Sequence, residues 1–191
     1  MNDPLNPRPG LWARLRRPSP RWSVLALASV GFVAGAISWG GFEASLQATN
    51  STQFCTGCHE MRDTVYAEFR GTIHDRNRTG VRASCGDCHV PRDWLHKLAR
   101  KVHSTNEIYH ALAGTIDTPA KFEAQRLALA TRVWDDMKAS NSRECRNCHA
   151  FEAMDPGRQQ EFARMAHQDA PANGQTCIDC HKGIAHALPR E

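Results

Sequence analysis

The stretch CTGCHEM at residues 55–61 decides the fold of this chain, because its core pattern, Cys-x-x-Cys-His, occurs four times. The later copies are CGDCH at 85–89, CRNCH at 145–149 and CIDCH at 177–181. Only the first copy has a methionine two positions after its histidine. All eight cysteines of the 191-residue chain belong to these cassettes, so none is left for a separate structural role.

Cys-x-x-Cys-His is the attachment sequence of c-type haem. The two thiols form thioethers with the haem vinyl groups, and the histidine that follows supplies an imidazole to the iron. Four cassettes that use every cysteine therefore predict four covalently bound haem c groups. The cysteines that would form the thioethers are Cys55, Cys58, Cys85, Cys88, Cys145, Cys148, Cys177 and Cys180. The cassette histidines that would bind iron are His59, His89, His149 and His181.

Three other uses of the cysteines explain less of the pattern. A disulfide framework gives no reason for a histidine after every pair. A pair of Cys₄ zinc sites also leaves the histidines unexplained, and 26 and 28 residues separate the paired motifs where zinc ribbons have about 15–20. A thioredoxin-like redox role lacks the alternating strand and helix pattern that should surround it.

Six histidines lie outside the cassettes, and three of them are predicted to be distal iron ligands. His74 and His167 occupy matching places, 11 and 10 residues before the second and the fourth cassette. His186 follows the last cassette closely, in HKGIAH. The remaining three, His96, His103 and His110, recur every seven residues and are interpreted as a solvated helix stripe. The spacing does not say which distal histidine serves which iron.

Three distal histidines for four haems leave one iron without a second imidazole. Because only the first cassette has a methionine, Met61, the iron of the first haem is predicted to be the one without a second imidazole. A methionine sulfur is a known axial ligand that raises the reduction potential. Met61 either replaces His59 at the iron or packs against the ring, and spacing alone favours packing.

The N-terminal part of the chain predicts a membrane anchor. Residues 22–42 contain no charged side chain, and this stretch is longer than the apolar part of a cleavable signal peptide. Five arginines and one acid precede it, which places residues 1–21 in the cytoplasm and residues 43–191 in the periplasm. Gly31 and Gly35 give a weak indication of a homo-oligomer through close helix contact.

The exported part is predicted to be mainly α-helical with irregular loops and little or no sheet. Two dihaem halves, about 50–115 and 140–191, look like a duplication, and a helical connector lies between them. A face with apolar residues at helical spacing runs from Trp94 to Leu112, and Thr118-Pro119 is typical of the start of a second helix. Residues 158–167 predict a shorter third helix. The formal charge of +4, without a basic run beyond residue 21, gives no indication of nucleic-acid binding.

The sequence also resembles the NapC/NirT family of membrane-anchored tetrahaem cytochromes c, most closely its NapC branch. The blocks that carry the resemblance are FCTGCHEMRDTVY, HDRNRTGVRASCGDCHVP, GTIDTPAKFEAQRLA, SRECRNCHAFEAMD and GQTCIDCHKGIAHALP. The resemblance implies a quinol dehydrogenase of the cytoplasmic membrane that passes electrons to a periplasmic reductase, most specifically a nitrate reductase. It does not distinguish menaquinol from ubiquinol. Alternatives are a nitrite reductase or another reductase as partner, or a terminal reductase that acts on a small molecule.

The resemblance further implies that Met61 binds the iron of the first haem and that an acid and a lysine lie near it. Lys101 and Glu107 are the closest match. From the sequence alone, Asp93 is a second acid that could accept a quinol proton, and Lys97 a second lysine that could polarise a quinol oxygen. Residues 43–54 span at most about 40 Å, so the first haem is tethered near the membrane surface.

Overall fold

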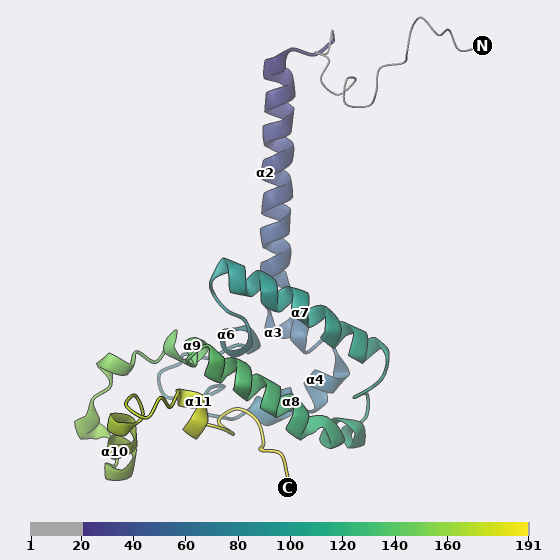
Figure 1. Ribbon diagram of the computed structural model, residues 1–191. Coiled ribbons are helices and arrows are strands. Elements are labelled where there is room, and N and C mark those ends of the chain that lie inside the picture. The colour runs from purple at the N-terminus through teal and green to yellow at the C-terminus, as the bar shows by residue number, and fades with distance from the viewer. Residues whose placement is uncertain (1–20, 191) are drawn as a thin grey trace, which may run out of the picture. The chain divides into compact units, whose positions relative to one another are not determined.

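The computed structural model describes residues 21–190 of the chain. Two compact units are distinguished, and the division falls between Leu46 and Gln47. Residues 21–190 contain helices, turns and loops but no strand, as the sequence predicts (Figure 1). The arginines that precede the predicted anchor, apart from Arg21, lie outside the described residues.

The first unit consists mostly of α2 (Val24–Ala48), a single helix that is long and apolar enough to cross a membrane. It starts two residues after the beginning of the predicted segment and continues six residues beyond its end. Its apolar side chains are largely exposed, including those of Val24, Leu25 and Phe32. A helix of 25 residues is about 37 Å long, which exceeds a hydrocarbon core of about 30 Å.

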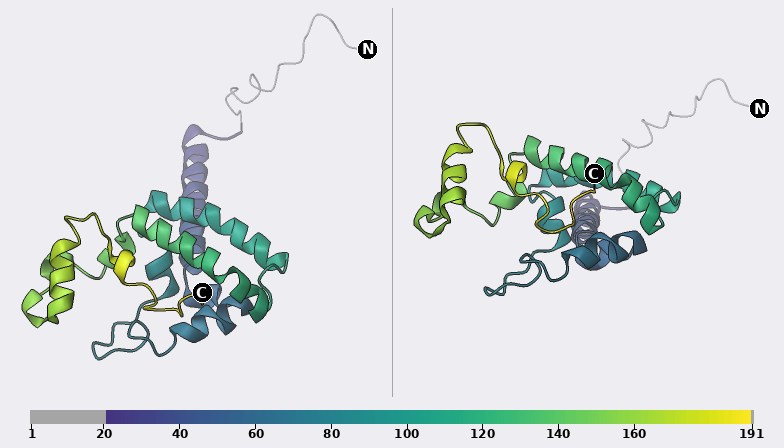
Figure 2. Two further views of the ribbon diagram at one scale, coloured as in Figure 1. Left: turned by 60° about the horizontal axis from the view of Figure 1, so that its bottom comes forward. Right: turned by 90° about the horizontal axis from the view of Figure 1, so that it is seen from below.

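Two long helices, α7 (Trp94–Leu112) and α8 (Pro119–Ala139), form the frame of the second unit. The predicted start of α8 is confirmed, because Thr118 is its N-cap, accepting a hydrogen bond from the Lys121 amide, and Pro119 lies in the first turn. Phe122 and Arg126 are the buried residues of α8. The predicted third helix is α10 (Glu161–Asp169), which lies at one end of this unit in each view (Figures 1 and 2).

The cassettes lie on or beside short helices. These are α3 (Thr52–Cys55), α4 (His59–Asp63), α6 (Cys85–His89), α9 (Arg143–Arg146) and α11 (Cys177–Cys180). The second and fourth cassettes begin in the same way, with a capping box of Ser84 and Asp87 in one and of Thr176 and Asp179 in the other. The remaining elements are α5 (Val65–Phe69) and two 3-10 turns, Phe151–Ala153 and Pro156–Arg158.

The described residues bury very few apolar side chains. Leu46, Phe69, Phe122 and Ile178 are the only hydrophobic residues in the core of residues 21–190. A chain of this length normally covers most of the apolar surface that its unfolded form exposes. The second unit therefore needs additional apolar material in its interior, and macrocycles attached to the cassettes would supply it.

Candidate functional site

The four cassettes lie beside one another in the order in which the chain presents them. Helix α3 packs against α6, and α6 packs against α9. The thiols of Cys55 and Cys85 lie within hydrogen-bonding range of each other. The third and fourth cassettes are joined by a buried hydrogen bond that the Ile178 amide donates to the Ser142 hydroxyl at 3.1 Å. Groups attached to successive cassettes are consequently neighbours.

Three cassette histidines face a second histidine ring. The ring centres of His89 and His186 are 6.2 Å apart, and those of His167 and His181 are 5.9 Å apart. The third pair, His74 and His149, has its ring centres 6.2 Å apart. The first two of these pairs have nearly parallel rings, at 29° and 28°, whereas the rings of the third pair are inclined at 79°. Two of the three pairs join a histidine of residues 50–115 to a histidine of residues 140–191.

This spacing fits an iron atom between two imidazoles. In such a complex each nitrogen lies about 2 Å from the metal and each ring centre about 1.2 Å beyond it, so the ring centres are about 6.4 Å apart. The outer nitrogens of two distal rings are already fixed. His186 Nδ1 lies 3.0 Å from the Val65 carbonyl, and His167 Nδ1 lies 2.8 Å from Gln159 Oε1. Each bond leaves Nε2 as the nitrogen available to a metal.

The third predicted distal ring, that of His74, lacks a hydrogen-bond partner for its outer nitrogen among the described residues. His74 Nδ1 is buried without a hydrogen bond among the described residues. A buried polar atom of this kind costs free energy unless another group satisfies it. The loop around it is nevertheless fixed, because Asp75 accepts a hydrogen bond from the Gly71 amide at 2.8 Å and pairs with Arg82 at 2.6 Å.

A charged network holds the segment that carries His186. Arg126 donates to both carboxylate oxygens of Glu68, at 2.6 and 3.1 Å, and to the Ala187 carbonyl at 3.2 Å. The Ala187 amide in turn donates to Glu68 at 3.0 Å. Burial raises the pKa of Glu68, but the hydrogen bonds from Arg126 and Ala187 lower it below its ordinary value. Arg126 and Glu68 thus fix the segment that carries a predicted distal histidine.

The surroundings of His89 and His186 favour neutral imidazoles. Burial lowers the pKa of His89 to about 4, and the neighbouring His186 contributes to the shift. Burial also lowers the pKa of His186, against the opposing effect of its bond to Val65. Both rings are therefore uncharged at neutral pH, the state in which a ring nitrogen can bind a metal.

The first cassette has a different environment. Within residues 21–190 no second imidazole faces His59, whose side chain is 54 % exposed. His59 Nε2, the nitrogen that would face an iron, lies 3.6 Å from the carboxylate of the buried Glu60. Met61 is half-buried on the same short helix, and residues two apart point to different sides of a helix. His59 and Met61 therefore cannot both turn toward one axial position.

Two of the predicted quinol-site residues lie near this cassette. The charges of Lys101 and Glu107 both act on the Cys55 thiol. Lys101 Nζ donates to the Thr49 carbonyl at 2.9 Å, and burial lowers the pKa of this lysine. Glu107 pairs with Arg100 at 2.7 Å, and Arg100 also donates to the His89 carbonyl at 3.2 Å. The side of α7 that carries these charges faces the first two cassettes.

The other two predicted quinol-site residues, Asp93 and Lys97, have different surroundings. Asp93 is the N-cap of α7, where it accepts a hydrogen bond from the His96 amide at 3.0 Å and pairs with the His96 ring at 2.5 Å. It also lies 3.7 Å from Arg143, beside the third cassette. Eight residues of helix, about 12 Å, separate Asp93 from Lys101. Lys97 is half-buried one turn before Lys101.

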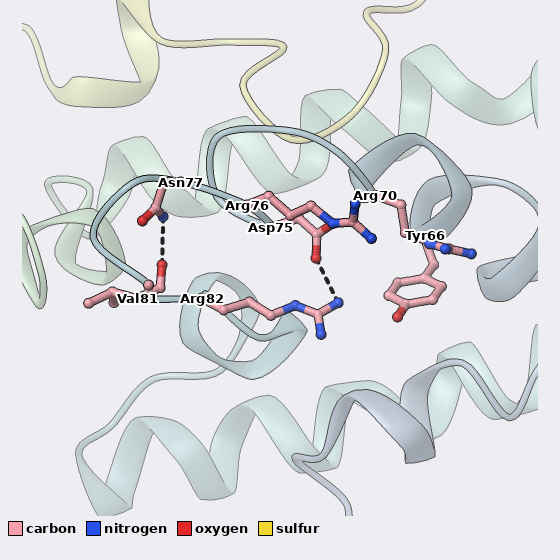
Figure 3. Close-up of a pocket in the computed structure, with 8 residues that line it drawn as sticks. Tyr66, Arg70, Asp75, Arg76, Asn77, Val81 and Arg82 are labelled. Atoms are coloured by element: carbon pink, nitrogen blue, oxygen red, sulfur yellow. Dashed lines mark hydrogen bonds and ion pairs between the residues drawn. The ribbon is translucent and has the colours of Figure 1, made fainter.

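An open hollow of about 550 Å³ lies between α5 and the loop that carries His74. Arg70, Arg76 and Arg82 line it, and Asp75 is the only carboxylate in the lining. Figure 3 shows the Arg82 guanidinium directed at Asp75. Three guanidiniums against one carboxylate leave a net positive surface, which suits an anionic group such as a haem propionate.

The histidines of the predicted solvated stripe lie apart from the imidazole pairs. His103 is exposed, and His110 is hydrogen-bonded to Thr115 on its own segment. Within residues 21–190, no group of three or more histidine, cysteine or acidic side chains converges as metal ligands. All eight cysteines are free of disulfides.

Sequence reasoning missed three residues that shape the site. Glu60 is inside the quoted CTGCHEM stretch, but nothing in the sequence indicates that it is buried against His59. Gln159 and Glu68 are ordinary polar residues in the sequence, and only the tertiary fold brings them to His167 and to the His186 segment. The capping role of Asp93 had a signal, since an aspartate immediately before an apolar helix is a preferred N-cap.

Comparison with known proteins agrees with this geometry. The sequence model of the NapC/NirT cytochrome c family, N-terminal region, matches residues 17–191. The chain is 57 % identical over 180 residues to the denitrification system component NirT of Stutzerimonas stutzeri, covering 94 % of this chain and 90 % of the relative. It is 51 % identical over 179 residues to the cytochrome c-type protein NapC of Escherichia coli K12, covering 94 % and 89 %.

A more distant relative is longer than this chain. The cytochrome c-type protein TorC of Escherichia coli K12 is 47 % identical over 180 residues, which is 94 % of this chain but 46 % of TorC. No solved structure matches the chain. The cassettes, the imidazole pairs and the apolar N-terminal helix are thus found in a sequence that matches one family over nearly its whole length. The chain belongs to the NapC/NirT cytochrome c family, and it is a membrane protein that carries haem c.

Proposed function

We propose that this protein is a quinol dehydrogenase that oxidises membrane quinol beside the first cassette and passes the electrons along four haem c groups to a soluble reductase. The observation that carries the proposal is the difference between the cassettes. Three of them face an imidazole pair, whereas the first has a lysine and an acid beside it and follows directly after the membrane helix. Each bound haem supplies an iron that gains and loses one electron.

The four cassettes define the binding of these groups. The eight cassette cysteines would form the thioethers, and His89, His149 and His181 would provide proximal imidazoles. We assign their distal partners as His186, His74 and His167, in that order, from the ring distances. At the first cassette Met61 would hold the iron, because His59 Nε2 lies 3.6 Å from the Glu60 carboxylate instead. The contacts between α3, α6 and α9 and between α9 and α11 set the order of electron transfer.

The α7 residues near the first cassette carry the proton chemistry. Oxidation of a quinol breaks two O–H bonds and yields a quinone, two electrons and two protons. Lys101 is placed to hold a quinol oxygen, since its ammonium is partly buried and has only a backbone carbonyl as its described partner. The Glu107 carboxylate, which is paired with Arg100 at 2.7 Å, accepts one proton. The second proton passes to water, and the haem held by the first cassette would take up the two electrons one at a time.

The sequence and the relatives support a compartment and a partner. Arginines outnumber acids before α2, which favours an N-terminus in the cytoplasm and cassettes in the periplasm. A relative named for denitrification and another named NapC favour a periplasmic reductase of nitrate or nitrite respiration as the acceptor. Gly31 and Gly35 have open space beside them on α2, which is compatible with a homo-oligomer.

The test is anaerobic mixing of the purified full chain with menaquinol and ubiquinol analogues while haem reduction is followed by absorbance. We expect Glu107→Gln and Lys101→Met to slow reduction by quinol about 10²-fold, the usual contribution of a positioned acid or base. Glu161→Gln is the matched control, because this acid is exposed on α10. Dithionite, which bypasses the quinol site, should reduce all variants at the same rate.

Three results would refute parts of this proposal. Equal rates of quinol oxidation in Glu107→Gln, Lys101→Met and the parent would show that the quinol site is not on α7. An added mass other than that of four haems would contradict the cassette assignment. Reoxidation of the reduced protein by nitrate or nitrite without any reductase would favour the terminal reductase instead.

A further inference from the structure

The side of α7 that points away from the cassettes is apolar. Leu95, Val102 and Tyr109 recur every seven residues and therefore share one side of the helix, and Leu112 lies next to Tyr109. We call these four residues the outer face of α7. Their exposed fractions are 69, 63, 65 and 85 % respectively.

The outer face does not turn toward the cassettes. Arg100 and Ser104 are on the opposite side of the helix. There Arg100 donates hydrogen bonds to the Ser104 hydroxyl and to the His89 carbonyl. Macrocycles attached to the cassettes would therefore cover the Arg100 side and leave the outer face uncovered. A contiguous apolar surface of this kind on a protein usually marks a binding site for another protein or for lipid.

Chain connectivity places α7 close to the membrane. Lys101, in the middle of α7, is hydrogen-bonded to Thr49, and Thr49 is the residue after the last residue of α2. The charge-free segment ends at Phe42, so only six residues of helix, about 9 Å, lie between its end and Ala48. The polar headgroup layer on each side of a bilayer is about 5–8 Å thick. The middle of α7 is consequently within reach of that layer.

The composition of α7 also suits a lipid surface. Between residues 94 and 112 the only carboxylate is Glu107, which Arg100 neutralises, while Lys97 and Lys101 remain positive. The helix has a tyrosine on its outer face and a tryptophan at its start, and both residue types favour the boundary between headgroups and acyl chains. Apolar residues on one side and a net positive charge are the properties of helices that lie in an anionic membrane surface.

From these observations we infer that the outer face of α7 is a second membrane contact, in which Leu95, Val102, Tyr109 and Leu112 insert into the headgroup region of the bilayer that α2 spans. The inference depends on membrane anchoring and does not depend on quinol oxidation. The contact would fix the first cassette at the depth of the lipid headgroups.

Hydrophobic photolabelling of the full holoprotein tests this contact. The protein is reconstituted into vesicles of phosphatidylethanolamine and phosphatidylglycerol and irradiated with a lipid-soluble diazirine, and the tryptic peptides are analysed by mass spectrometry. Peptide 102–121 contains Val102, Tyr109 and Leu112. Peptide 159–164 contains Phe162, which is exposed to 85 %, as Leu112 is, but lies on α10. Labelling of each peptide is divided by its labelling in the unfolded chain.

We expect peptide 102–121 to be labelled roughly tenfold more than peptide 159–164, because several of its apolar side chains are in the lipid. The double variant Val102→Asn and Tyr109→Asn should lose most of that labelling, while its absorption spectrum and the labelling of α2 stay as in the parent. Equal labelling of the two peptides would overturn the inference. Labelling of peptide 102–121 that falls as the protein density in the vesicles rises would also overturn it, because a second copy would then cover the face.

Discussion

The first cassette and the second illustrate how one motif is used in two ways. His89 of the second cassette is buried against His186, and a hydrogen bond to Val65 and the network of Arg126 and Glu68 hold that partner. His59 of the first cassette is half exposed, is paired with Glu60 and faces no imidazole among residues 21–190. Closed sites suit storage and transfer of electrons, since no other ligand can approach. A site with one weakly held side suits contact with a substrate.

The largest effect should come from opening a closed cassette. In His186→Ala the second iron loses its distal imidazole and should change from low spin to high spin, which removes one low-spin signal from the electron paramagnetic resonance spectrum. His103→Ala is the control, because this histidine is exposed on α7. Low-spin signals that are all intact in His186→Ala would show that the two cassettes do not differ in the proposed way.

The next effect concerns the ligand of the first cassette. Met61→Leu keeps the volume of the side chain but removes the sulfur, so the near-infrared absorption of a ferric iron bound to methionine should disappear. The control is Met165→Leu, at an exposed methionine of α10. An unchanged spectrum would mean that Met61 only packs and that His59 turns away from Glu60 to bind the iron.

A smaller effect is expected when the support of His186 is weakened. Glu68→Gln should lower the free energy of unfolding by about 1–2 kcal/mol, because Arg126 and the Ala187 amide lose a charged acceptor. The folded-state pKa of Glu68 is below its ordinary value, so its stabilisation is full above the ordinary value of about 4.3 and is lost as the pH falls through the folded-state pKa. Denaturant unfolding at neutral and acid pH measures both effects.

Acid should therefore destabilise the parent more than Glu68→Gln, in which this carboxyl no longer titrates. Glu161→Gln, at an exposed acid of α10, should unfold as the parent does at either pH. If Glu68→Gln and the parent show the same pH dependence, the carboxylate does not stabilise the fold.

The smallest effect is expected at the fourth cassette. Gln159→Leu removes the hydrogen-bond partner of His167 Nδ1, which makes the imidazole a weaker donor to ferric iron. The reduction potential of one haem should rise by about 60 mV or less. For one electron, about 60 mV corresponds to a tenfold change in the equilibrium constant of reduction. The neighbouring Gln160→Leu, whose side chain is exposed, is the control in a redox titration.

The sequence predicted the helices better than the site. The helix at 94–112 and the start of α8 at Thr118-Pro119 depend on local periodicity and capping, which the sequence shows directly. The matching capping boxes at Ser84 and Thr176 likewise follow from local sequence. The apolar residues of α7, however, do not form a core. Periodicity reveals which residues share a side of a helix, but it does not say whether that side faces protein or lipid.

The site depends on contacts that are distant in the sequence. The duplicated arrangement suggests that His74 and His167 have equivalent partners, yet His74 faces the third cassette and His167 faces the fourth. A histidine's partner is decided by where α6, α9 and α11 pack, and no local signal encodes that. The same applies to Glu60, whose burial against His59 depends on the surrounding fold.

The two histidine pairs that join residues 50–115 to residues 140–191 have a consequence for how the protein is made. The ribosome makes the chain from its N-terminus, so the second cassette is complete long before His186 is added. Under the proposed ligand assignment, a haem attached to this cassette would have a single imidazole until His186 arrives. A chain that stops before residue 186 would leave the second cassette open, so closure of that cassette reports that synthesis has passed this residue.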